Sequence, residues 1–190
     1  IALIAAFAVG RTQEVLTVLE KYGILKNYET FLDGLGIEVS RIIKSESFMI
    51  RERENFLKSL KRVEFVNSKS KRRKIIKKPS IIISGAGMLD GGPIAWYLPR
   101  LAKSDKNSLI LTGYQVKGSA GRKLLDTGIY QVNGKEIRVK LNVSYFDFSA
   151  HAGRSELLEF IDLVSPEKIF LVHGEKAVSY THLTLPTTER

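Results

Sequence analysis

The sequence contains no cysteine, only three histidines, and no apolar run longer than residues 1–9. The absence of cysteine excludes a disulfide framework, a thiolate metal site and a cysteine nucleophile, so a metal would have to be held by imidazole and carboxylate groups. A membrane-spanning helix needs about 20 apolar residues, and no basic segment precedes the run as it would in a signal peptide. We therefore expect a soluble, cytoplasmic protein with no membrane partner. The chain begins at Ile1 in the middle of an expected strand, so we also expect it to be part of a longer protein.

Acidic residues are scarce relative to basic ones, because 20 Asp and Glu face 30 Lys and Arg and leave a net charge of +10. Such an excess indicates a polyanionic partner, and nucleic acid is the first candidate. Residues 69–78 hold seven cations and no acid: Lys69, Lys71, Arg72, Arg73, Lys74, Lys77 and Lys78. A run of this kind is usually a solvated loop. Because this one holds most of the excess charge, contact with a polyanion is an equally good interpretation.

Apolar strands and amphipathic helices alternate along the chain, which predicts an α/β fold with helices flanking a mostly parallel sheet. Strands are expected at 1–9, 28–32, 80–83, 108–112 and 168–172, and helices at 11–22, 38–47, 48–60, 93–103, 118–125 and 154–164. One antiparallel excursion is expected, because Asn133-Gly134 is a strong type I′ hairpin signal. The alternating apolar residues from Ile137 to Val143 would form its returning strand.

Two glycine-containing turns precede expected helices. The turn at 84–92 has the first two glycines of a dinucleotide motif, but Asp90 occupies the third position and no acidic residue follows the next strand. Backbone N–H groups could cradle a phosphate there, and a tight turn needed only for packing is an equally good interpretation. The turn at 118–122 places Arg122 near a helix N-terminus, which suits a backbone phosphate.

His151 and His173 are expected at the ends of sheet segments. His151 lies among small residues between a strand and a helix, and His173 ends an expected buried strand, where α/β sheets present ligands. Neutral imidazole is a common zinc ligand, although a lone histidine is more often satisfied by backbone hydrogen bonds. By spacing alone the two residues form an incomplete metal or acid/base pair.

Six motifs occur in the order in which β-CASP metallo-β-lactamase-fold nucleases carry them. They lie at residues 7–14, 84–88, 113–115, 118–122, 148–152 and 171–175. The chain resembles this family over nearly everything before residue 178. It is most similar to the archaeal and eukaryotic branch related to the cleavage and polyadenylation specificity factor endonuclease, and ribonuclease J is a more distant relative.

The resemblance implies a β-CASP cassette over residues 1–147. Residues 148–177 would then return to the metallo-β-lactamase αββα domain. Gly153 stands where many relatives carry Asp, and Ala5 where many carry Pro. Residues 178–190, which include His182, resemble translated sequencing-adapter read-through, so we expect this tail to be non-native.

The resemblance also implies roles for individual residues. His151 matches a catalytic histidine close to the scissile phosphate, and His173 matches a zinc ligand that is typical of RNA-processing members. The residues expected to bind RNA are Ser84, Gly85, Lys71, Arg72, Arg73, Lys74, Arg122 and Ser149. Two zinc ions would be bound in the intact protein, and most of their ligands would lie upstream of Ile1.

We therefore predict a fragment of a zinc-dependent ribonuclease that acts in RNA processing or decay and is inactive by itself. Its expected partner is RNA, and a homodimer or a processing complex would be compatible with the sequence. Two alternatives remain open, a non-catalytic RNA-binding β-CASP subunit and a nucleotide-binding α/β domain.

Overall fold

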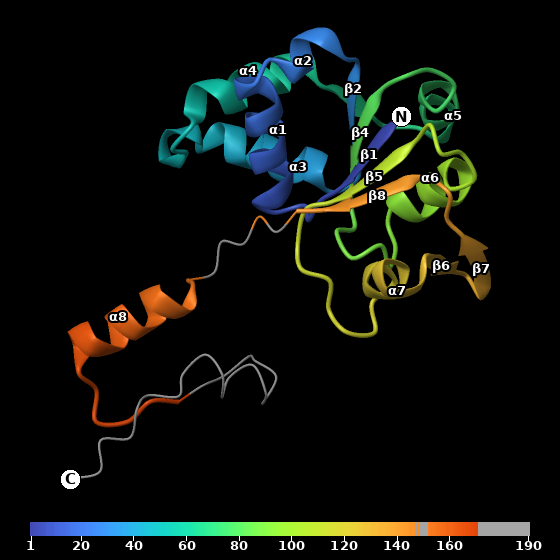
Figure 1. Cartoon of the computed structure of the whole chain (residues 1–190). Helices are drawn as coiled ribbons and strands as arrows, with labels where there is room; N and C mark the ends of the chain where they lie inside the picture. Colours follow the sequence, from blue (N-terminus) through green and yellow to red (C-terminus); the bar gives the residue numbers. More distant parts are fainter. Residues whose placement is uncertain (147, 149–151, 171–190) are drawn as a thin grey trace. The chain divides into compact units, whose positions relative to one another are not determined.

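The computed structural model describes residues 1–146, 148 and 152–170, and the chain forms two compact units, 1–149 and 150–190. The first unit is built on a six-stranded sheet in the order β3-β2-β4-β1-β5-β8. Figure 1 shows β2, β4, β1, β5 and β8 side by side in this sheet. Every strand pair in this sheet is parallel. The strands are β1 (Ala2–Ala5), β2 (Thr30–Asp33), β3 (Glu64–Val66), β4 (Ile81–Ser84), β5 (Ser108–Leu111) and β8 (Asn142–Tyr145). The predicted α/β fold with a mostly parallel sheet is confirmed.

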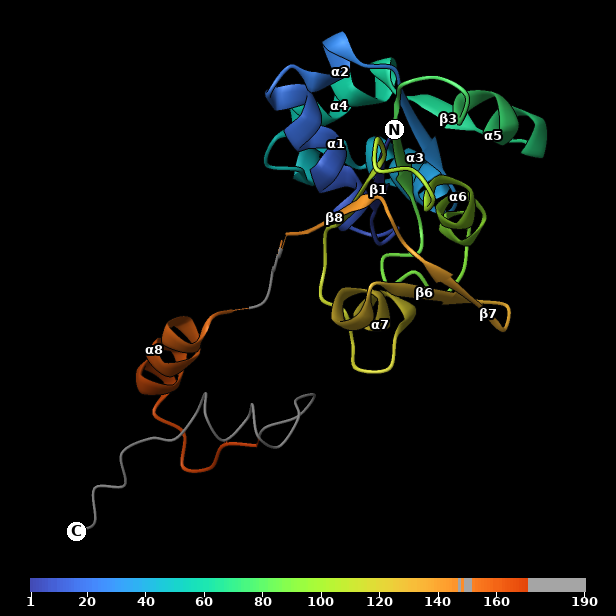
Figure 2. The same cartoon turned by 45° about the vertical axis from the view of Figure 1, so that its right-hand side comes forward.

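Helices cover both faces of the sheet, because alternate residues of each strand point to opposite sides. Leu3, Ile82 and Leu109 belong to one buried cluster, and Ile4 and Ile83 belong to the other. The second cluster is covered by α1 (Arg11–Lys21), α2 (Ile24–Asn27), α3 (Gly36–Ser45) and α4 (Arg53–Arg62). The first is covered by α5 (Lys69–Ile75), α6 (Ile94–Leu101) and α7 (Ala120–Thr127). Figure 2 shows α5 and α6 on the opposite side of the sheet from α1 and α4.

The antiparallel excursion is a separate two-stranded sheet, β6 (Ile129–Val132) paired with β7 (Lys135–Arg138). Asn133 and Gly134 have φ values of 49° and 71°, as the predicted type I′ turn requires. The single returning strand expected from Ile137 to Val143 is wrong, because β7 ends at Arg138 and β8 begins at Asn142 in the large sheet. The backbone N–H of Lys140 donates to Ala102 O at 2.7 Å, and the nearby Leu141 is buried. These contacts turn the chain from one sheet into the other.

The basic run is not a loop, because residues 69–75 form α5. The Ser68 hydroxyl caps this helix by accepting a hydrogen bond from the Lys71 N–H at 3.1 Å. Ile75 is only 3% exposed and packs in the buried cluster beneath the helix. The cap and this apolar anchor explain why a segment so rich in like charges is helical. The sequence analysis also did not predict α2, β3 or the short 3-10 helix Ser47–Met49.

The second unit contains α8 (Arg154–Val164), which confirms the expected helix at 154–164. The Glu156 carboxylate accepts a hydrogen bond from the Gly153 N–H at 2.7 Å and so caps the helix. None of the helix residues is buried, and Leu163 is 82% exposed. The buried strand expected at 168–172 is wrong for residues 168–170, which are exposed and belong to no strand, and 171–172 lie outside the described residues. Within the described residues, no helix has the length and apolar character that crossing a membrane requires.

Candidate functional site

The carboxyl edge of the parallel sheet is where α/β folds place their ligand sites. Three adjacent strands, β4, β1 and β5, send their following loops to this edge. The Phe7 ring lies directly against two of these loops, because a Cβ on Gly87 or on Gly113 would come within 3.0 Å of ring carbons. Any larger residue at Gly87 or Gly113 would push the ring away. The glycines of these two motifs therefore allow an aromatic side chain to join the loops.

Gln115 joins the same loops to α7. Its side-chain amide is buried and donates to Gly87 O at 3.0 Å and to Gly113 O at 2.7 Å. A Cβ on Gly121 would lie 1.8 Å from Gln115 Oε1, so only glycine fits at that position while Gln115 keeps this place. Gly87 and Gly121 thus have packing roles that the sequence left undecided.

The N-terminus of α7 has its backbone donors already engaged. The N–H of Ala120 donates to Asp90 Oδ1 at 2.7 Å, that of Gly121 to Met88 O at 2.9 Å, and that of Arg122 to Ser119 Oγ at 3.1 Å. A phosphate at this turn would therefore meet the Arg122 side chain rather than free backbone amides. That side chain is 49% exposed and forms an ion pair with Asp126 at 2.9 Å, which raises the Arg122 pKa.

Of the other residues expected to bind RNA at this edge, Ser84 is fully buried. Its hydroxyl donates to Gly85 O at 3.1 Å, and the same carbonyl accepts a hydrogen bond from the Ile94 N–H at 2.9 Å. Gly85 is partly exposed. The Ser84 side chain is thus turned inward in this structure, and the surface of the turn is backbone.

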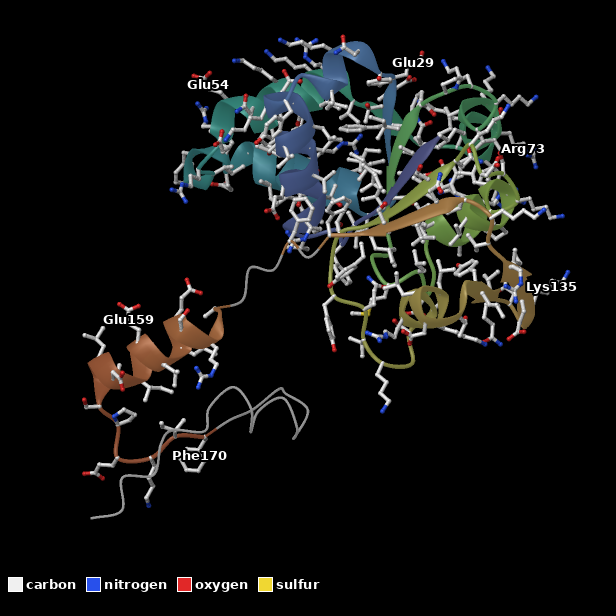
Figure 3. The ribbon with its side chains drawn as sticks, viewed as in Figure 1. Glu29, Glu54, Arg73, Lys135, Glu159 and Phe170 are labelled. Carbon is white, nitrogen blue, oxygen red and sulfur yellow. The ribbon has the colours of Figure 1, made fainter. Side chains whose placement is uncertain are left out.

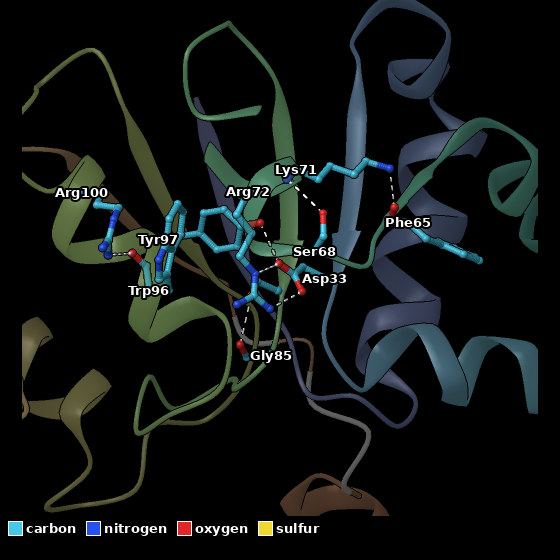
Figure 4. Close-up of polar contacts among 10 residues, drawn as sticks. Asp33, Phe65, Ser68, Lys71, Arg72, Gly85, Trp96, Tyr97 and Arg100 are labelled. Atoms are coloured by element: carbon cyan, nitrogen blue, oxygen red, sulfur yellow. Dashed lines mark hydrogen bonds and ion pairs between the residues drawn. The ribbon is translucent and has the colours of Figure 1, made fainter. Parts of the chain in front are cut away.

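A buried polar network ties α5 to the sheet and to α6 (Figure 4). Arg72 Nε and Nη2 donate to Asp33 Oδ2 and Oδ1 at 2.6 and 2.9 Å, and the Tyr97 hydroxyl donates to Asp33 Oδ2 at 2.7 Å. Asp33 is 1% exposed and Tyr97 is fully buried, whereas the Arg72 side chain is 23% exposed. Burial, together with the hydrogen bond to Asp33, raises the Tyr97 pKa. The hydrogen bond to Asp33 raises the Arg72 pKa, so the guanidinium stays charged and acts as an anchor.

The seven cations of the basic run divide into two groups. Arg72, Lys71 and Lys78 form ion pairs with Asp33, Glu64 and Glu29, respectively. The other four cations are exposed and have no ion pair among the described residues: Lys69, Arg73, Lys74 and Lys77. Figure 3 shows Arg73 at the outer side of α5. Helix α5 therefore presents uncompensated positive charge to the solvent while its own paired cations hold it to the sheet.

His151, His173 and Ser149 lie outside the described residues. Among the residues that the structure does describe, no cluster of three or more His, Cys, Asp or Glu side chains could hold a metal ion. The described part of the chain thus does not fit a zinc site by itself.

Asp33 and Tyr97 were not singled out from the sequence, and Gln115 was named only as part of the motif at 113–115. Asp33 ends a strand immediately before a glycine turn, which was the one available signal that it faces the carboxyl edge. Tyr97 carried no such signal, because its partner is set by the packing of distant segments.

Comparison with known protein families gives two matches. The Beta-Casp domain matches residues 12–124, and the Zn-dependent metallo-hydrolase RNA specificity domain matches residues 136–184. The second match extends into the segment 178–190 that the sequence analysis assigned to a non-native tail.

Several curated archaeal proteins are similar to the chain. It is 41% identical over 180 residues to the Probable RNase MJ4 of Methanocaldococcus jannaschii, covering 93% of the chain and 42% of that protein. It is 34% identical to the RNase aCSPSF2 of Saccharolobus solfataricus, covering 90% of the chain and 34% of that protein. It is also 36% identical to the Transcription termination factor FttA of Methanocaldococcus jannaschii, covering 92% of the chain and 31% of that protein. The chain thus spans well under half the length of each of these relatives.

Proposed function

Because this chain belongs to the β-CASP family, as its sequence motifs predicted, we propose that it is part of a zinc-dependent ribonuclease and supplies a surface that binds RNA. The names of two relatives, Probable RNase MJ4 and RNase aCSPSF2, support hydrolysis of RNA as the activity of the whole protein. The net charge of +10 supports a polyanionic substrate.

The observation that carries this proposal is the set of four exposed cations on and just after α5, Lys69, Arg73, Lys74 and Lys77. Cations without internal partners can replace the counterions around RNA phosphates, and the released counterions supply much of the binding free energy. The α5 helix is also well anchored, because Arg72 pairs with Asp33 and Lys71 with Glu64. We therefore assign the phosphate contacts chiefly to the four exposed cations. Arg72 and Lys71 hold the helix that presents them.

The remaining assignments follow the family pattern. We propose that residues 1–147 form the cassette and 148–177 the return to the metal domain. In that domain His173 would be one zinc ligand, and His151 would stabilise the phosphorane oxygens or protonate the leaving oxygen. Ser149 and Arg122 would contact the RNA backbone. When bound, the zinc ions would supply an activated water for attack on the phosphodiester.

Removing the four exposed cations tests the RNA-binding surface. We expect the variant Lys69→Ala, Arg73→Ala, Lys74→Ala, Lys77→Ala to bind single-stranded RNA more weakly and with a flatter dependence on salt. Each lost phosphate contact lowers the slope of log K against log salt by ~0.7, so four lost contacts lower it by up to about 3. Fluorescence anisotropy of a labelled RNA over a series of salt concentrations measures this slope.

A matched control is available on the opposite face of the sheet. Lys26, Lys44, Arg51 and Lys61 are three lysines and one arginine that are exposed and form no ion pair within the described part of the chain. Changing these four to Ala makes the same change in net charge and should leave the slope close to that of the unmodified chain. Equal effects of the two variants would overturn the assignment of α5. Saturable binding of a mononucleotide without preference for longer RNA would instead favour a nucleotide-binding domain.

A further inference from the structure

Exposed aromatic side chains gather at the carboxyl ends of three adjacent strands. Strand β5 lies between β1 and β8, with Leu111 paired to Ala5 on one side and to Tyr145 on the other. Just beyond these positions Phe7 is 37% exposed, Tyr114 is 60% exposed and Phe146 is 53% exposed. Large apolar groups that gather on one surface commonly mark an interaction site.

Tyr114 lies in a loop between two buried residues, Thr112 and Gln115. Thr112 before it is 2% exposed and donates from its hydroxyl to Ala5 O at 2.7 Å. Gln115 after it is 2% exposed and donates to Gly87 O and Gly113 O. The backbone on both sides of Tyr114 is therefore held in place, while the phenol ring faces solvent. A ring presented in this way loses little conformational freedom when a ligand covers it.

Positive charge lies next to this ring. A Cβ on Gly121 would lie 1.8 Å from Gln115 Oε1, so the residue after Tyr114 touches the residue before Arg122. The Arg122 side chain is 49% exposed. Lys117 is exposed on the same loop as Tyr114. An aromatic face with cations beside it is complementary to single-stranded nucleic acid, in which flat bases alternate with phosphates. A purely apolar protein partner would leave Lys117, which has no ion pair among the described residues, without a counter-charge.

We propose that Tyr114 stacks on a base of single-stranded RNA while Arg122 contacts an adjacent phosphate. This inference rests on the proposed function and adds to it a second contact that depends on the base. Stacking tolerates every base, because each base has a π face. The site therefore favours unpaired RNA over duplex without reading a sequence.

The test compares two ligands of equal length, an adenosine oligonucleotide and an abasic ribose-phosphate oligonucleotide. Tyr114→Ala should weaken binding of the adenosine oligonucleotide about 5- to 100-fold, which is the effect expected for one stacked base. It should leave the affinity for the abasic oligonucleotide and the salt slope unchanged. Tyr114→Phe, which keeps the ring, should bind both ligands as the unmodified chain does.

Tyr28→Ala is the matched control, because Tyr28 is 58% exposed and ends α2 on the other face of the sheet. This variant should bind both oligonucleotides normally. Equal losses for both oligonucleotides in Tyr114→Ala, or no loss for either, would overturn the stacking proposal while salt-dependent binding through α5 persists. Absence of binding to either oligonucleotide by the unmodified chain would overturn the proposed function itself. If the apolar edge instead packs on another part of a longer protein, Tyr114→Ala leaves both affinities unchanged, which also contradicts stacking.

Discussion

Replacing Arg72 with Ala lowers the free energy of unfolding of the chain by about 3 kcal/mol, because it leaves a buried carboxylate without its counter-charge. Asp33 is 1% exposed and accepts two hydrogen bonds from Arg72 and one from Tyr97. The loss lies at the lower end of the range for broken buried ion pairs, since the Arg72 side chain keeps 23% exposure and water can partly replace it. Urea unfolding followed by circular dichroism measures the change.

The neighbouring variant Arg73→Ala is the control for this measurement. Arg73 is exposed and has no ion pair within the described residues, so its removal should change the unfolding free energy by less than about 0.5 kcal/mol. Replacing Arg72 and Asp33 together with Met and Asn should recover part of the loss, because no buried charge then remains unpaired. If Arg72→Ala and Arg73→Ala have the same small effect, Arg72 does not anchor α5.

The second prediction concerns cleavage. The 190-residue chain should show no metal-dependent RNA cleavage above background and no tight stoichiometric zinc binding. A catalytic zinc typically needs about three protein ligands, and the family pattern assigns only His173 to that role in this chain. A longer version that restores the length of the relatives should cleave RNA. Cleavage assays and zinc titrations on both proteins measure the difference.

Within the longer version, His151→Ala should reduce the rate about 10²- to 10⁴-fold, as expected when a general acid or base is lost. His182→Gln should leave the rate unchanged, because we assign His182 to a non-native tail. Zinc-dependent cleavage by the 190-residue chain would contradict the assignment of most ligands to the rest of the protein. A longer version that binds no metal and cleaves nothing would favour a non-catalytic RNA-binding subunit.

Much of the fold could be predicted because its signals are local. The run Ile81–Ser84 is buried throughout and its three isoleucines are β-branched, as expected for a central parallel strand. The Asn133-Gly134 turn followed from the tolerance of these residues for positive φ. The glycine turn at 84–88 was expected to join a strand to a helix, and it lies between β4 and α6.

The parts that could not be predicted depend on contacts between distant residues. Arg72 meets Asp33 across 39 positions, and Tyr97 meets Asp33 across 64. The sequence does not show which distant residues come into contact, so Arg72 could not be distinguished from Arg73. For the same reason the basic run fitted a solvated loop as well as contact with a polyanion. The first part of the expected strand at 168–172 was misjudged for a related reason. An apolar run forms a buried strand only where other strands pair with it, and residues 168–170 are exposed.

Ultraviolet crosslinking tests directly whether single-stranded RNA binds to α5. Single-stranded RNA crosslinked to the chain, digested and analysed by mass spectrometry reports which peptides touch it. We expect crosslinked peptides that contain residues of α5. These crosslinks should be lost in the variant in which Lys69, Arg73, Lys74 and Lys77 are replaced by Ala. Crosslinks confined to α1–α4, and unchanged in that variant, would contradict it.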